Sequence, residues 1–158
     1  MRRSTVLSAF VLLSPLACGG SSPTAAGPGT STSGPMSATI EGVAWASPVP
    51  QGSYKNGIVA IAGLDLGLTN SVSIAVALAT APGTYSLSYG NANFANGGVA
   101  KPSGAGWTSG LPGGTGSVTF TVLTATHVAG TFAFDAVPSG TTATGTLHVT
   151  NGKFDVTF

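Results

Sequence analysis

Charged side chains are scarce in this sequence of 158 residues, which holds only 5 Lys and Arg and 4 Asp and Glu. They make up 6% of the chain, whereas about 25% is usual in a soluble domain. So few basic residues exclude a nucleic-acid-binding face, which depends on clustered Lys and Arg. The shortage of titratable groups also argues against acid–base catalysis. The hydrophobic fraction of 42% and the net charge of +1 exclude a chain that is disordered throughout.

Cysteine and long apolar runs are also scarce. Cys18 is the single cysteine, so no disulfide can form within the chain. No apolar run reaches the roughly 20 residues that a membrane-spanning helix needs. The longest N-terminal run, Val6–Leu13, follows Arg2 and Arg3 and leads into small residues. This order is typical of a secretory signal peptide, which we place at residues 1–17.

The position of Cys18 directly after this signal resembles the lipobox of bacterial lipoproteins. In those proteins the cysteine becomes the lipid-bearing N-terminus after cleavage in front of it. Ala17 provides the small residue before the cut, whereas Pro15 departs from the usual Leu at its position. The alternative is an ordinary secretory signal with an incidental cysteine. We expect lipidation at Cys18, with more than one acyl chain for stable anchoring in the membrane.

The next segment, residues 19–35, consists only of Gly, Ser, Pro, Thr and Ala. Such a composition cannot bury a core, and it predicts a flexible tether with a span of roughly 20–25 Å. The sequence therefore predicts three parts. These are a signal peptide (1–17), a lipidated cysteine with its tether (18–35) and one folded domain (36–158).

Apolar and polar residues alternate repeatedly in the predicted domain, which is typical of strands with one buried face. We predict an all-β, single-domain antiparallel β-sandwich, with a small closed or partly open β-barrel as the alternative. Ile58–Leu64 is apolar at every position and is expected to be central and buried on both faces. Gly97-Gly98 is expected to form a turn. The expected strands are 37–40, 43–45, 58–65, 71–78, 84–89, 94–101, 117–123, 130–136, 144–149 and 153–158.

The C-terminal third predicts a meander that starts at residue 116. Asn151-Gly152 is typical of a two-residue hairpin turn. That turn would place His148 opposite Asp155 on the solvated face, beside Thr131. The pair could belong to a catalytic dyad, but nothing in the sequence indicates that Thr131 is an activated nucleophile. We favour a cross-strand ion pair, and we therefore predict no catalytic residue.

Aromatic and amide side chains supply the candidate ligand-binding residues. Tyr54, Tyr89, Asn91, Asn93 and Trp107 could bind a carbohydrate or a protein from a loop rim. They could equally close the ends of a small core, because Trp is usually mostly buried.

Other residue patterns give weaker indications. We assign Trp45 to the core. Rows of Thr on the strands could form a flat binding face, but Thr also suits a solvated strand, and we favour that interpretation. His, Asp and Glu show no metal-ligand spacing, and no motif indicates a cofactor.

Several short motifs recur in a family that this sequence resembles. They are Ile40-Glu41-Gly42-Val43-Ala44-Trp45, Gly83-Thr84-Tyr85, the Val-x-Gly-x-Phe-x-Phe segment 128–134, and Asn-Gly-x-Phe at 151–154. The arrangement resembles small bacterial lipoproteins of unknown function over roughly residues 37–158. The resemblance implies a β-rich, envelope-anchored domain and provides no catalytic residue.

These observations predict a lipid-anchored cell-envelope protein whose β domain is non-enzymatic and serves in binding or structure. Gly19 after the cysteine resembles the pattern for sorting to the outer membrane. One alternative is an integral outer-membrane β-barrel, because Phe154, Val156 and Phe158 resemble the last strand of such barrels. The other is a hydrolase that uses His148.

Overall fold

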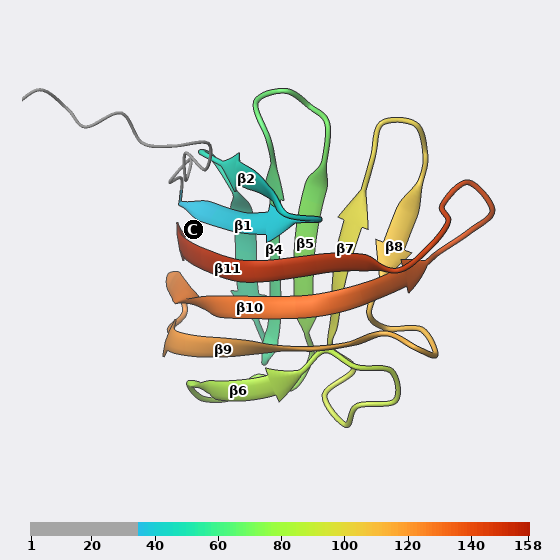
Figure 1. Cartoon of the computed structure of the whole chain (residues 1–158). Coiled ribbons are helices and arrows are strands. Elements are labelled where there is room, and N and C mark those ends of the chain that lie inside the picture. Colours follow the sequence, from blue (N-terminus) through green and yellow to red (C-terminus); the bar gives the residue numbers. More distant parts are fainter. Residues whose placement is uncertain (1–34) are drawn as a thin grey trace, which may run out of the picture.

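The computed structural model describes residues 35–158, which form 11 antiparallel strands (Figure 1). The predicted signal peptide, Cys18 and nearly all of the tether lie outside the described residues. No helix in the described part of the chain is long and apolar enough to cross a membrane. The strands are β1 (Met36–Ile40), β2 (Val43–Ser47), β3 (Gln51–Lys55), β4 (Ile58–Leu64), β5 (Ser71–Val76), β6 (Gly83–Ser86), β7 (Asn96–Ala100), β8 (Gly106–Thr108), β9 (Thr115–Leu123), β10 (His127–Pro138) and β11 (Leu147–Thr157).

The strands belong to one sheet that curls strongly into an open half-barrel. Its main path runs β2-β1-β11-β10-β8-β7-β5-β4-β3, and β9 and β6 extend it beside β10. In Figure 1 a front layer of β6, β9, β10, β11, β1 and β2 crosses a back layer that contains β4, β5, β7 and β8. The all-β antiparallel prediction is confirmed. The two layers are continuous, so the partly open barrel describes the fold more closely than two separate sheets.

Strand β10 joins the two layers. Most of its length pairs with β9 and β11 in the front layer. Its last residues, Val137 and Pro138, pair with Thr108 and Trp107 of β8 in the back layer. A strand of 12 residues extends about 40 Å, which is long enough to take part in both layers.

The core fills the space between the layers. Phe120 of β9 is its largest fully buried side chain, and it makes edge contacts with Tyr85 at 5.6 Å and Phe154 at 5.7 Å between ring centroids. Trp45 is only 4% exposed, so its predicted core position is confirmed. Side chains from both layers therefore share one hydrophobic core.

The predicted turn at Gly97-Gly98 is wrong, because both residues lie inside β7. A Cβ added at Gly97 would lie 2.5 Å from the ring of Phe134. The glycine is needed for this close approach between the layers.

The predicted hairpin at Asn151-Gly152 is also wrong. Both residues lie within β11, which continues for 11 residues. Phe132 pairs with Gly152 but Phe134 pairs with Val149, so β11 holds one extra residue at this point. This is a β-bulge, and Asn151 takes the left-handed conformation there, with a φ of 54°.

The bulge shifts the alternation along β11 by one residue. A two-residue hairpin would shift the phase in the same way, so the hairpin and the bulge predict the same buried side chains. Those side chains are Leu147, Val149, Phe154 and Val156, all of which face the core. The meander is confirmed, but it consists of three long strands, β9, β10 and β11, and residues 144–146 lie in a connection.

Two features of the back layer differ from the sequence prediction. β4 does lie between β3 and β5, but only its inward residues are buried, and Ile58 and Leu64 are exposed on the other face. The prediction of burial on both faces is wrong because no further element covers this side within residues 35–158. Strands β3 and β8 were not predicted, since both are short and lack an apolar alternation.

Candidate functional site

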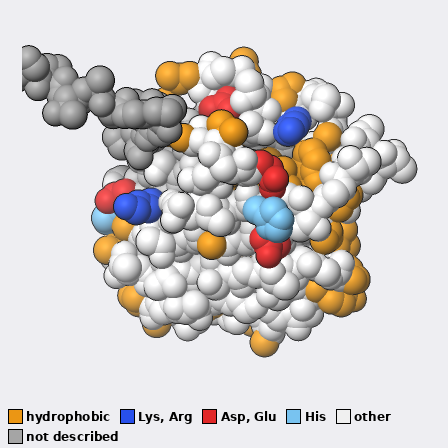
Figure 2. All heavy atoms as spheres, viewed as in Figure 1, with side chains coloured by type: hydrophobic (Ala, Val, Ile, Leu, Met, Phe, Trp, Pro, Cys, Tyr) orange, Lys and Arg blue, Asp and Glu red, His pale blue; other side chains and the backbone are white. Residues whose placement is uncertain are grey.

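The outer face of the front layer carries small polar side chains in rows. Because side chains alternate across a strand, the residues between the buried core positions all point to this face. Figure 2 shows that most of the face is uncharged and that carboxylates and imidazoles gather at separate places on it.

A trough open to solvent, of about 660 Å³, crosses this face, and we call it the hydroxyl trough. Ala44 on β2 and Ala133 on β10 keep parts of this trough low, because their outward side chains end at Cβ. The lining residues are Ser37, Ala38, Thr39, Ala44, Ser117, Thr119, Thr131, Phe132, Ala133, Asn151, Gly152 and Lys153.

Hydroxyl groups dominate the polar lining of the trough. Each Ser or Thr hydroxyl can both donate and accept a hydrogen bond. The hydroxyls of Thr84 and Thr119 lie 2.8 Å apart and bond to each other at one side of the trough. Lys153 is the one charged residue among the lining residues. The surface is therefore suited to a polar ligand with little charge.

Two smaller hollows continue the trough in opposite directions. A hollow of about 390 Å³ shares Thr131 and Lys153 with the trough and reaches Asp155. A hollow of about 270 Å³ shares Ser117 and reaches Asp135. Both hollows extend along β10 and β11, at right angles to the trough, so a carboxylate lies on each side of it.

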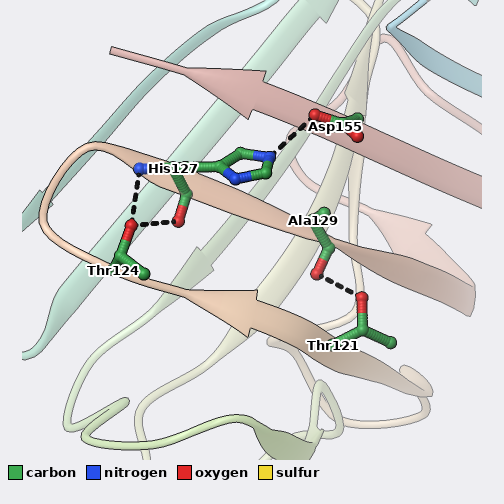
Figure 3. A network of polar contacts seen from close by, with 5 residues as sticks. All are labelled: Thr121, Thr124, His127, Ala129 and Asp155. Atoms are coloured by element: carbon green, nitrogen blue, oxygen red, sulfur yellow. Dashed lines mark hydrogen bonds and ion pairs between the residues drawn. The ribbon is translucent and has the colours of Figure 1, made fainter.

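The carboxylate on one side, Asp155, is paired with His127. Nε2 of His127 lies 2.8 Å from Oδ1 of Asp155 (Figure 3). The hydroxyl of Thr124 holds the backbone of His127, because it accepts from the His127 N–H at 3.0 Å and donates to the His127 carbonyl at 3.1 Å. The turn between β9 and β10 therefore positions this imidazole.

The carboxylate on the other side, Asp135, is paired with His148. Nδ1 of His148 lies 2.6 Å from Oδ1 of Asp135, its cross-strand partner on β10. The hydrogen bond and the negative charge of Asp135 raise the pKa of His148, and the charge of Glu41 adds to this effect. The backbone N–H of His148 also donates to the carboxylate of Glu41.

The predicted pairing of His148 with Asp155 is therefore wrong. The bulge keeps β11 extended, so the two residues lie on the same strand rather than on two arms of a hairpin. Each finds its partner on β10 instead, since Asp135 faces His148 and Asp155 lies beside Ala129, two residues from His127.

Among the described residues, each histidine ring bonds to one carboxylate. Within residues 35–158, neither imidazole is hydrogen-bonded to a hydroxyl that could act as a nucleophile. Both pairs are exposed, with side-chain exposures of 35% and 71% for His127 and Asp155. In the same part of the chain, no group of three or more His, Cys, Asp or Glu could hold a metal ion. This geometry gives two surface His–carboxylate pairs that border the hydroxyl trough.

A family model described as "Domain of unknown function (DUF6252)" matches residues 33–156. The chain belongs to this family. No curated protein and no solved structure matches it. The match establishes a β-rich DUF6252 domain and provides no activity.

Two of the aromatic residues predicted to bind ligand take part in packing of the DUF6252 domain. Trp107 on β8 is 9% exposed, and its indole N–H donates to the carbonyl of Gly145 at 3.0 Å. Tyr54 on β3 is partly buried against the core, and its hydroxyl donates to the carbonyl of Ala79.

The other three predicted residues lie on the connection between β6 and β7. Tyr89 is 60% exposed there. Asn91 organises the loop, because its amide donates to the carbonyls of Ser88 and Ala95 and its oxygen accepts from the N–H of Asn93. None of the five residues lines the hydroxyl trough. Their role in ligand binding stays a prediction.

The sequence did contain a signal for the trough, namely the rows of Thr on the strands. Those rows indicate a polar outer face but not the hollow in it, which also depends on the short side chains of Ala44 and Ala133.

Proposed function

We propose that this chain is an exported cell-envelope protein, anchored by lipid at Cys18, and that its DUF6252 domain is a non-enzymatic binding module. The hydroxyl trough is the observation that supports a binding role most strongly. It offers many hydrogen-bonding groups on one continuous surface. Within residues 35–158, the two neighbouring imidazoles bond to carboxylates and not to a hydroxyl that could act as a nucleophile.

The anchor is proposed from the order of the N-terminal segments. A basic start, a short apolar run, one cysteine and a tether precede the domain. A tether with a span of roughly 20–25 Å would let the trough stand clear of a membrane surface. Gly19 after the cysteine supports attachment to the outer membrane.

The distribution of side chains favours an anchored domain over an integral outer-membrane barrel. A barrel in a membrane turns an apolar band toward the lipid and polar residues toward its interior. In the front layer the order is reversed, since Phe120 and Phe154 lie inside while Thr119 and Thr131 point outward.

The intact mass of the full chain extracted from membranes tests the anchor. We expect a chain that begins at Cys18 and carries more than one acyl group, and we expect the matched variant Cys18→Ser to lack this mass and leave the membrane fraction. Proteolysis within the tether should release the domain in soluble form. A soluble product with a free thiol at Cys18 would contradict the anchor.

The trough itself needs a separate test of the binding role. We expect Thr119→Val and Thr131→Val together to weaken the retention of ligands from a cell-envelope extract of the producing organism roughly 10-fold, while Thr157→Val on the same face does not. If the trough variant retains the same compounds as the unchanged protein, the trough is not the binding surface.

A further inference from the structure

We infer that the ligand of the hydroxyl trough is a neutral glycan chain that lies across the strands. This inference rests on the proposed binding role of the trough and names the class of ligand.

The shape of the trough supports a chain rather than a compact molecule. Its lining residues come from β2, β1, β11, β10 and β9, which are neighbours in the sheet. Four spacings of about 4.8 Å between these strands give a length of about 19 Å. The two smaller hollows widen it on either side, toward Asp155 and toward Asp135. A linear polymer of several sugar residues fits this long, open form.

The chemistry of the lining matches hydroxyl groups on the ligand. Ser37, Thr39, Ser117, Thr119 and Thr131 provide five hydroxyls, each of which is a donor and an acceptor. A sugar hydroxyl is also both, so the two surfaces can pair in either direction at every contact. No aromatic side chain offers a stacking platform here, since Phe132 is 4% exposed. The contacts would therefore be made by the edges of the sugar rings.

The carboxylates on the two sides of the trough add strong acceptors. Imidazole rings occupy Oδ1 of Asp155 and Oδ1 of Asp135. The second oxygen of each carboxylate can accept from a ligand, although Oδ2 of Asp135 has one long contact of 3.4 Å with Thr115. A carboxylate that can accept from neighbouring hydroxyls of one sugar suits the sides of such a site.

Two other classes of polymer fit less well. A peptide binds a sheet most readily by adding a strand to its edge. The trough lies on the face of the layer, where the backbone groups of β10 and β11 already pair with their neighbours. An acidic polymer would need several cations, and the trough has only Lys153 among its lining residues.

The test measures binding of the full chain, extracted from membranes in detergent, to immobilised oligosaccharides. The probes are neutral linear hexasaccharides of glucose, mannose and N-acetylglucosamine, hexasaccharides of uronic acids, and polar peptides of matching length. We expect binding to at least one neutral hexasaccharide. Thr119→Val with Thr131→Val should weaken it roughly 10-fold, because two hydrogen bonds are lost while the side-chain shape is kept.

Two variants serve as matched controls. Thr157→Val lies on the exposed face of β11 outside the trough and should bind like the unchanged protein. Thr131→Ser keeps the hydroxyl and should retain most of the binding. The circular dichroism and melting temperature of each variant show whether it is folded, and Ser117→Ala replaces the double variant if that one unfolds.

The remaining outcomes separate this inference from the proposed function. Binding of uronic acids alone, lost in Lys153→Ala, would overturn the neutral glycan but keep the trough as a binding surface. Binding of peptides alone, lost in the double variant, would have the same meaning. Failure of every probe would overturn the glycan inference, and glycan binding that the trough variants leave unchanged would overturn the role of the trough as well. The lipid anchor is tested independently by mass.

Discussion

At the residue scale, the position of Gly97 is decisive. It lies in the middle of β7, and the ring of Phe134 from the other layer passes directly over it. A methyl group at Gly97 would lie 2.5 Å from that ring, so one of the two layers must shift. We expect Gly97→Ala to lower the free energy of unfolding by about 1–3 kcal/mol, as overpacking of a core does. Chemical denaturation measures this loss.

Gly98→Ala is the matched control in the same strand. Its added methyl group would meet the Oγ atom of Ser73 at 3.0 Å, and that side chain can rotate away. We therefore expect a smaller effect than at Gly97. Equal losses in the two variants would show that strand propensity, rather than contact with Phe134, sets the cost.

The pairing of His148 with Asp135 makes a second prediction at this scale. Asp135 raises the pKa of His148 in the folded protein. The contribution of the pair to stability is therefore present below the ordinary histidine pKa of about 6.5 and is lost as the pH rises through the folded value. We expect Asp135→Asn to lower the pKa of His148, as measured by NMR titration of the imidazole protons.

Asp155→Asn serves as the control for this titration. Asp155 lies beside His127, so the variant should leave the pKa of His148 unchanged. A pKa of His148 that does not move in Asp135→Asn would show that the pair contributes nothing to the protonation of His148 in solution.

At the scale of a single element, the bulge in β11 depends on the left-handed backbone of Asn151, with its φ of 54°. Glycine adopts this conformation freely, whereas a β-branched residue resists it. We expect Asn151→Gly to be tolerated and Asn151→Val to lose about 1–2 kcal/mol of unfolding free energy. Denaturation of the two variants side by side measures the difference. If Asn151→Val is as stable as Asn151→Gly, the bulge does not hold this conformation in solution.

The same element shows how far the sequence pattern can predict structure. The alternation identified the buried side chains of β11, because either a hairpin or a bulge moves the pattern by one residue. It could not distinguish the two, since Asn and Gly favour a left-handed backbone in both. Whether the chain forms a hairpin or a bulge decides the partners of His148 and Asp155. The ion pairs were therefore predicted wrongly, although the buried face was predicted correctly.

At the scale of the whole molecule, the trough could not be predicted from the sequence. Alternation places Ser37, Thr119 and Thr131 on outward faces, but the local pattern does not specify which strands are neighbours. The N-terminal strand β1 pairs with the C-terminal strand β11, and this long-range contact brings Ser37 opposite Lys153. The trough crosses five strands from distant parts of the chain, and it exists only after the sheet has assembled.

One core shared by two continuous layers predicts cooperative unfolding of the whole domain. The two tryptophans report on this, because Trp45 lies on β2 of the front layer and Trp107 on β8 of the back layer. Each also bonds across the molecule, since the indole of Trp45 donates to the carbonyl of Asn70 at 3.1 Å and that of Trp107 to Gly145. In Trp45→Phe and in Trp107→Phe, we expect the remaining fluorescence and the circular dichroism to change at the same denaturant concentration. Each variant should be less stable than the unchanged protein by about 1 kcal/mol or more, because an indole hydrogen bond is lost. If the fluorescence of either tryptophan changes at a lower denaturant concentration than the circular dichroism, its layer opens before the rest. That result would contradict a single cooperative core.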